Sequence, residues 1–119
     1  MKKYAMFIGR WQTWHTGHEW LINQQLNKGK NCWVAIRDVQ QDENNPKTAQ
    51  QILKELSNEP FFTNNFDKIL LSIIPDIESV NYGRGVGYDV IYHEPPTDVA
   101  QISGTAIRNG EMNNDGSTT

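Results

Sequence analysis

Two histidines flank a threonine and a glycine near the start of the chain, in the stretch GRWQTWHTGHEW (residues 9–20). Neutral imidazoles can donate hydrogen bonds to phosphate oxygens, so His15 and His18 are candidate donors. Arg10 supplies a fixed positive charge nearby, and Gly17 lets a ligand come close to the backbone. These residue types at this spacing indicate a binding site for a phosphate-bearing anion, with Gly9 as a further backbone position within it.

A second stretch with phosphate-binding chemistry, ISGTAIR, occupies residues 102–108. Ser103 is suited to cap a helix, Thr105 places a hydroxyl in its first turn, and Arg108 follows about one turn later. The free N–H groups at a helix start carry partial positive charge and attract anions. We therefore predict a second contact to a polyphosphate at this end of the chain.

Short apolar runs alternate with helical patterns, and these elements must position the two stretches. Runs of this kind are typical of strands buried on both faces of a parallel sheet, and they lie at residues 4–8, 31–36, 68–74 and, more weakly, 89–92. Capping boxes predict one helix from Thr16, with Glu19 as its partner, to near Gly29, and another from Thr48, with Gln51 as its partner.

This alternation predicts an α/β fold, a Rossmann-like, doubly wound and mostly parallel sheet with right-handed crossovers. We expect one small domain over residues 1–108 and a loose C-terminal tail over 109–119. Ligands of such sheets bind at the carboxyl ends of the strands. The HTGH stretch lies at that edge, and we expect a second substrate to meet side chains near the same edge, namely Trp14, Arg37, Asp38, Asp76, Tyr82 and Arg84.

HTGH (15–18) and ISGTAIR (102–108) together resemble the HxGH and ISxTxxR signatures of the nucleotidyltransferase superfamily. The pattern is nearest to the archaeal-type nicotinamide mononucleotide adenylyltransferases, whose G-R-F-Q-P-x-H-x-G-H opening is similar to residues 9–18. Residues 45–49, NPKTA, resemble their N-P-F-T-A helix start. The resemblance covers almost the whole chain, but a strand and a helix that those enzymes carry after the PDI segment (75–77) have no counterpart, nor does their nicotinamide-binding tryptophan.

The resemblance implies transfer of a nucleoside monophosphate, AMP from ATP, to a phosphate-bearing small-molecule acceptor, with release of pyrophosphate. It implies catalytic roles for His15, His18 and Arg108, and nucleotide contacts from Gly9, Arg10, Gly17, Ser103 and Thr105. Mg²⁺ is expected on the nucleotide phosphates, with no metal site in the protein itself. A cytidylyltransferase that uses CTP and a non-catalytic nucleotide-binding module are the alternatives.

The composition of the chain argues against several other classes of function. A net charge of −3, from 11 basic and 14 acidic residues, is not that of a nucleic-acid-binding surface, and no apolar run is long enough to cross a membrane. The single cysteine, Cys32, cannot form an internal disulfide, which favours the cytoplasm. A zinc site of His15, His18 and Cys32 is a weaker hypothesis, since Cys32 lies in an apolar run. With 37% hydrophobic residues the core is small, so we expect a homo-oligomer.

Overall fold

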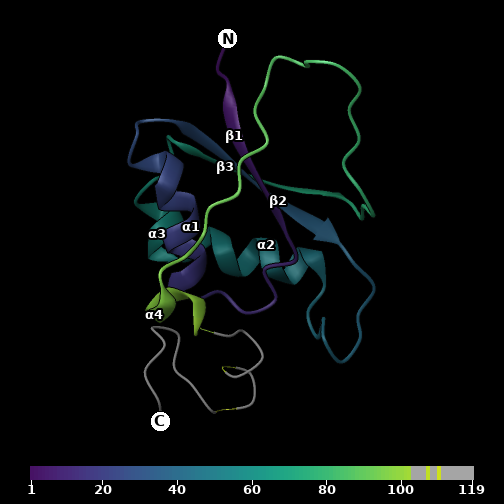
Figure 1. The fold of residues 1–119 in the computed structure, drawn as a ribbon. Helices are drawn as coiled ribbons and strands as arrows, with labels where there is room; N and C mark the ends of the chain where they lie inside the picture. Colours follow the sequence, from purple (N-terminus) through teal and green to yellow (C-terminus); the bar gives the residue numbers. More distant parts are fainter. Residues whose placement is uncertain (103–106, 108–109, 111–119) are drawn as a thin grey trace.

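Three parallel strands form the sheet around which the chain is organised (Figure 1). The strands β1 (Tyr4–Gly9), β2 (Asn31–Asp38) and β3 (Ile69–Pro75) pair in the order β1-β2-β3. The computed structural model describes residues 1–102, 107 and 110. The α/β fold class and the parallel sheet of a single small domain are confirmed.

The helices connect these strands in regular alternation. α1 (Thr16–Leu26) leads from β1 to β2, and α2 (Ala49–Ser57) with the short α3 (Pro60–Thr63) leads from β2 to β3. A last short helix, α4 (Thr97–Ala100), follows the long segment after β3. Within the described part of the chain, every helix is too short or too polar to cross a bilayer.

The core lies between one face of the sheet and the helices. The strand register places Phe7, Val34 and Leu71 side by side on this face. Ile22 of α1 and Leu56 of α2 pack into the same cluster, which the other buried residues Trp11, Trp14, Cys32, Ile36, Ala49, Ile52 and Phe62 complete. Because both crossovers step in the same direction along the sheet and have the same hand, α1 and α2 cover the same face, as Figure 1 shows.

The opposite face of the sheet is open and apolar. Tyr4, Met6 and Ile8 of β1 are 42%, 41% and 38% exposed, and Leu70 of β3 is 43% exposed. On the same face Trp33 of the central strand donates from Nε1 to Ser72 Oγ, 2.6 Å away. The prediction that residues 4–8 are buried on both faces is therefore wrong, because β1 is an edge strand with helices on one side only.

The helix boundaries follow capping chemistry. α2 begins as predicted, since Thr48 Oγ1 accepts from the Gln51 N–H (3.2 Å) and Gln51 Oε1 accepts from the Thr48 N–H (2.7 Å). α1 ends at Leu26, and Gly29 turns the chain with a φ of +76°, in the left-handed region that favours glycine. The start of α1 differs from the prediction and belongs to the candidate site.

The fourth predicted strand, at residues 89–92, does not form. Val90, Ile91 and Tyr92 are 71%, 56% and 82% exposed and lie in a segment between β3 and α4 that holds no strand or helix. A strand needs a partner, and a parallel strand beside β1 would need a crossover connection from β3, for which helices usually serve. Figure 1 shows the first part of this segment as an open loop away from α1, α2 and α3, after which the chain crosses back past β1 to reach α4.

Candidate functional site

A pair of imidazoles forms the start of α1. His15 is the N-cap, with extended backbone (φ −151°, ψ 172°), and its Nδ1 accepts from the Gly17 N–H at 3.1 Å. The His15 N–H in turn donates to His18 Nδ1 at 3.3 Å. This is a capping box built from histidines, so the predicted Thr16 cap is wrong. Nδ1 of histidine stands as far from its backbone as the Asn or Asp oxygen that usually makes this contact.

The same contacts fix the protonation of both rings. A ring nitrogen that accepts a backbone N–H carries no proton, so in each neutral imidazole the proton is on Nε2. Burial lowers the pKa of His15, and burial together with the nearby His15 lowers the pKa of His18 to about 3. The two rings stack with centroids 3.8 Å apart. Near pH 7 the site therefore offers two neutral Nε2–H donors of fixed tautomer.

Two tryptophans pack around His18. The ring centroids of Trp11 and Trp14 lie 5.1 and 5.2 Å from that of His18. Trp11 donates from Nε1 to the Ala35 carbonyl at 3.0 Å, and Trp14 donates from Nε1 to Glu19 Oε2 at 2.9 Å. Glu19 is thus engaged by Trp14 and has no part in the capping box. Trp14, a predicted acceptor contact, is only 8% exposed and belongs to the core, packed against Phe61 and Phe62.

The two glycines of the stretch make room for these side chains. A methyl group on Gly17 would lie 2.8 Å from His15 Cε1 and 2.9 Å from His15 Nδ1. A methyl group on Gly9 would lie 2.8 Å from Trp11 Cε2. Real Cβ atoms do not approach other atoms this closely, so a larger residue at either position would displace a ring of the site. The close approach that these glycines permit is that of the protein's own rings.

Two polar links tie the segment between β1 and α1 to the segment between β2 and α2. Arg10 Nη1 donates to Asn45 Oδ1 at 3.1 Å. Gln12 makes both backbone hydrogen bonds of Lys47, since its Nε2 donates to the carbonyl and its Oε1 accepts from the N–H, each at 3.0 Å. Gln12 and Asn45 are each 6% exposed. Sequence reasoning missed both, although a polar residue beside Trp11 in a turn next to the core must find a partner if it is buried.

The C-terminal part of the chain reaches the start of α1 through α4. A methyl group on Gly17 would lie 3.8 Å from Val99 Cγ1, and α4 packs against α1. The first residue of the ISGTAIR stretch, Ile102, follows two residues after α4. The predicted nucleotide contacts Ser103, Thr105 and Arg108 lie outside the described residues, as does the predicted tail apart from Gly110.

Two residues predicted to contact the acceptor pair with each other. Arg37, near the end of β2, contacts Asp76 Oδ1 through Nε and Nη2, both at 2.8 Å. Its Nη2 also donates to the Ile77 carbonyl at 3.1 Å. This ion pair fastens the chain after β3 to the end of β2.

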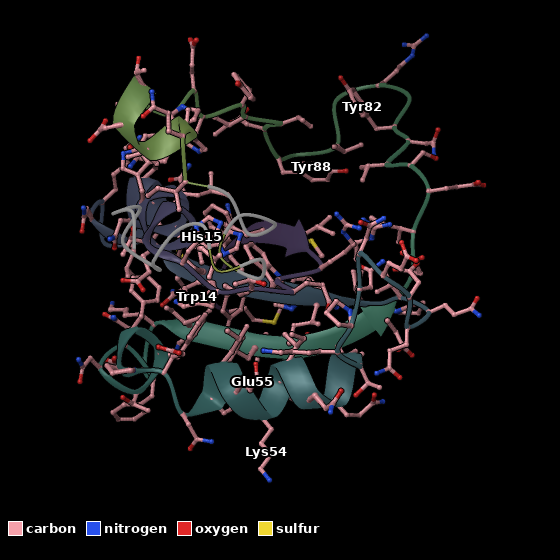
Figure 2. The ribbon with its side chains drawn as sticks, turned by 90° about the horizontal axis from the view of Figure 1, so that it is seen from below. Trp14, His15, Lys54, Glu55, Tyr82 and Tyr88 are labelled. Carbon is pink, nitrogen blue, oxygen red and sulfur yellow. The ribbon has the colours of Figure 1, made fainter. Side chains whose placement is uncertain are left out.

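No described hydrogen bond or ion pair joins the other predicted acceptor contacts to His15 or His18. Asp38 ends β2 and is exposed. Tyr82 and Arg84 are exposed in the segment between β3 and α4. Figure 2 shows Tyr82 on this loop, well apart from His15 and Trp14. The structure therefore brings His15 and His18 together, while Tyr82 lies away from them.

The described residues do not form a cluster of metal-ligating side chains. No group of three or more His, Cys, Asp or Glu side chains in residues 1–102, 107 and 110 is arranged to hold a metal ion. Cys32 is buried in the core and pairs with Ala5, at the opposite end of β1 from the HTGH stretch. The zinc hypothesis with His15, His18 and Cys32 is therefore wrong.

The surface hollow along α2 and α3 lies away from the predicted site. Figure 2 shows Lys54 and Glu55 of this hollow on the α2 side of the molecule, away from His15. None of the residues that line it belongs to the predicted site; they are Gln51, Lys54, Glu55, Asn58, Glu59 and Pro60. The imidazole pair at α1, by contrast, has two Nε2–H donors of fixed tautomer, and Arg10 lies in the segment just before it.

Comparison with protein family models, curated proteins and solved structures finds no match to this chain. The architecture is that of a small α/β domain with a three-stranded parallel sheet. Chemically, the arrangement at α1 can donate hydrogen bonds to an anion from two neutral imidazoles.

Proposed function

We propose that this chain is a nucleotidyltransferase that moves AMP from ATP to a phosphate-bearing small molecule and releases pyrophosphate. The observation that carries the proposal is the His15–His18 pair, whose Nδ1 atoms are occupied by backbone N–H groups. Both Nε2–H groups are left to act as neutral donors at the start of α1. The resemblance of HTGH and ISGTAIR to the superfamily signatures supplies the class of reaction.

The chemistry requires placement and charge stabilisation more than it requires a base. A phosphate oxygen of the acceptor attacks the α-phosphorus, and the bond from that phosphorus to the bridging oxygen breaks. The bonding electron pair leaves with pyrophosphate. Because the nucleophile is already an anion, no strong base is needed, and oriented donors to the α-phosphate lower the barrier as charge builds there. Donors of fixed tautomer need no reorganisation during the reaction.

The remaining roles come from the resemblance and from the arrangement of the chain. Mg²⁺ would arrive on the triphosphate and neutralise part of its charge. Arg10 would meet the triphosphate beside the histidines. Ser103, Thr105 and Arg108 would hold the β- and γ-phosphates, and the packing of Val99 toward Gly17 supports the approach of that segment to α1.

One observation favours the second candidate, a non-catalytic nucleotide-binding module. Tyr82 and Arg84, expected to contact the acceptor, are both exposed, and Tyr82 lies well apart from His15 in Figure 2. A chain that binds nucleotide and has no acceptor pocket would bind the triphosphate without releasing pyrophosphate. The test below separates the two candidates.

The test compares nucleotide binding with turnover in the wild-type protein and in His18→Ala. We expect Mg²⁺–ATP to bind both within a few-fold in calorimetric titration. Pyrophosphate release with a panel of phosphorylated acceptors should fall in His18→Ala by about a hundred- to a thousandfold, the usual cost of one oriented donor. His93→Ala removes an imidazole outside the site and serves as the control, with urea unfolding confirming that each variant is folded.

Other outcomes of this test would change or overturn the proposed function. Binding of CTP in place of ATP would move the proposal to the cytidylyltransferases. Binding of ATP without pyrophosphate release for any acceptor would favour the binding module. A wild-type protein that binds neither nucleotide at millimolar concentration would overturn the proposal, as would full activity in His18→Ala.

A further inference from the structure

Asn45 is a buried side chain that connects the segment before α2 with Arg10. It is 6% exposed, and its Oδ1 accepts from Arg10 Nη1 at 3.1 Å. The two residues are 35 positions apart in the sequence and belong to different crossovers. Arg10 itself is exposed at the end of β1, in the segment that leads to the imidazole pair.

Asp42 fixes the direction in which the Asn45 amide points. A single oxygen, Asp42 Oδ1, accepts from Asn45 Nδ2 at 2.9 Å and from the backbone N–H groups of Asn44 and Asn45, each at 2.8 Å. Since the Asn45 Nδ2 is held by the carboxylate, Oδ1 of the same amide is turned toward Arg10. Desolvation raises the pKa of Asp42, but the hydrogen bonds from Asn45 and Asn44 and the charge of Arg10 outweigh it and lower the pKa. Asp42 therefore stays ionised and continues to accept.

We propose that Asn45 is a positioning residue, which holds the Arg10 guanidinium in place to meet the phosphates of the nucleotide. This inference rests on the proposed function. An exposed arginine samples many rotamers, and ordering it on binding costs affinity. Arg10 offers five N–H donors, so one hydrogen bond to Asn45 leaves the others for phosphate oxygens. Asn45 thus orders the side chain before the ligand arrives.

The chain contains a matched control for this role. Gln12 links the same two segments through the backbone of Lys47, but no described hydrogen bond joins it to Arg10. If Asn45 only tied the segments together, loss of Gln12 would have a comparable effect on nucleotide binding. If Asn45 acts by orienting the guanidinium, its effect disappears when Arg10 is absent.

The experiment is a double-mutant cycle on the full chain. The dissociation constant for Mg²⁺–ATP is measured for the wild-type protein, Arg10→Ala, Asn45→Ala and Arg10→Ala/Asn45→Ala, with the urea midpoint of each. We expect Asn45→Ala to weaken binding about three- to tenfold, the cost of ordering one long side chain. In the Arg10→Ala background it should weaken binding no further. In turnover, Asn45→Ala should raise the nucleotide KM and leave kcat within about twofold, a split that lost stability alone does not produce.

The control is the same cycle with Gln12→Ala in place of Asn45→Ala. Any loss of ATP affinity caused by Gln12→Ala should be the same with and without Arg10. Equal loss of affinity on removing Asn45, with or without Arg10, would overturn the inference, as would unchanged affinity in Asn45→Ala. In both cases the wild-type protein still binds ATP, so neither result contradicts the proposed function. A wild-type protein that binds neither ATP nor inorganic tripolyphosphate overturns the inference together with the proposed function.

Discussion

At the scale of the residue, the two histidines at the start of α1 both cap the helix and stay neutral. His15 accepts the Gly17 N–H that an asparagine or aspartate would usually take, and His18 accepts the N–H of His15. A protonated Nδ1 could accept neither bond. The cap of the helix and the neutral state of the imidazoles therefore depend on each other, which makes the stability of the fold sensitive to acid.

We predict that the free energy of unfolding falls between pH 6.5 and pH 5. The pKa of His18 is lowered from 6.5 to about 3 in the folded protein, so in this range the unfolded chain binds more protons than the folded chain. The stability from a neutral His18 is complete above about pH 6.5 and is lost as the pH falls toward 3. One such group contributes at most about 1.4 kcal/mol per pH unit. Urea unfolding at pH 7.5, 6.0 and 5.0 measures this slope.

His18→Gln should show a shallower dependence over the same range. The pKa of His15 is lowered in the same direction, so part of the slope persists. His93→Gln removes a histidine outside the capping box and should keep the full slope. An unchanged slope in His18→Gln would mean that this ring is not held neutral by the fold.

Sequence reasoning identified the HTGH stretch and Arg10 but not their partners. The strand run before the stretch and the helical pattern after it are local signals, so the site could be placed at the end of β1. Gln12 and Asn45 were missed because their hydrogen bonds span 35 positions and exist only once two segments meet. The cap was misassigned because hydroxyl and carboxylate residues are the usual caps, and a histidine is rarely considered.

At the scale of the element, apolar runs located the three strands, and capping patterns located the two longer helices. The prediction of a strand at residues 89–92 was wrong because a β-forming composition does not provide a strand to pair with. Val90 and Tyr92 are exposed, and this segment is not part of the described sheet. The exposed face of β1 was also not predictable, since Tyr4, Met6 and Ile8 are as apolar as residues of a strand buried on both sides. Which face a helix covers depends on the direction and hand of the crossovers.

We predict that Gly17→Ala separates the stability of α1 from the activity of the protein. Alanine favours a helix over glycine by up to about 1 kcal/mol, while displacement of the His15 ring loses a cap of about the same size. The two effects nearly cancel in urea unfolding. The ring cannot keep its place 2.8 Å from the new methyl, so pyrophosphate release should fall roughly a hundredfold.

The stability control is Gly85→Ala, which adds the same methyl where no atom lies within 4 Å. Its unfolding midpoint should match that of the wild-type protein. Wild-type activity in Gly17→Ala would show that the position of the His15 ring does not matter for turnover.

At the scale of the whole molecule, the open face of the sheet is the feature that most needs a partner. Met6, Ile8 and Leu70 expose about four-tenths of their surface on one side of the domain, where α/β sheets are usually covered. Contiguous apolar surface of this kind is typical of interaction sites. The same face on a second copy is complementary in composition, and two-fold contacts are the commonest assembly of soluble chains.

We expect a dimer in solution that Met6→Lys converts to a monomer, because a buried ammonium at the interface would be unpaired. Light scattering across a wide range of protein concentration measures the mass. Gln50→Lys changes an exposed residue of α2, which covers the other face of the sheet, and it should leave the dimer intact. A single-subunit mass for the wild-type protein at every concentration, or a dimer in Met6→Lys, would contradict this assembly.

The order of the strands in the sheet has a consequence for how the chain can fold while it is being synthesised. β1, β2 and β3 stand side by side in the order in which they leave the ribosome, and no described strand has to be inserted between two earlier ones. Once residue 38 has emerged, Phe7, Ile22 and Val34 can already meet, and α2 and β3 then add at the free edge of β2. Pairings between successive strands keep the closing loops short, which favours rapid folding. The HTGH turn lies inside the unit that can form first, so the imidazole pair can be assembled before the rest of the domain exists.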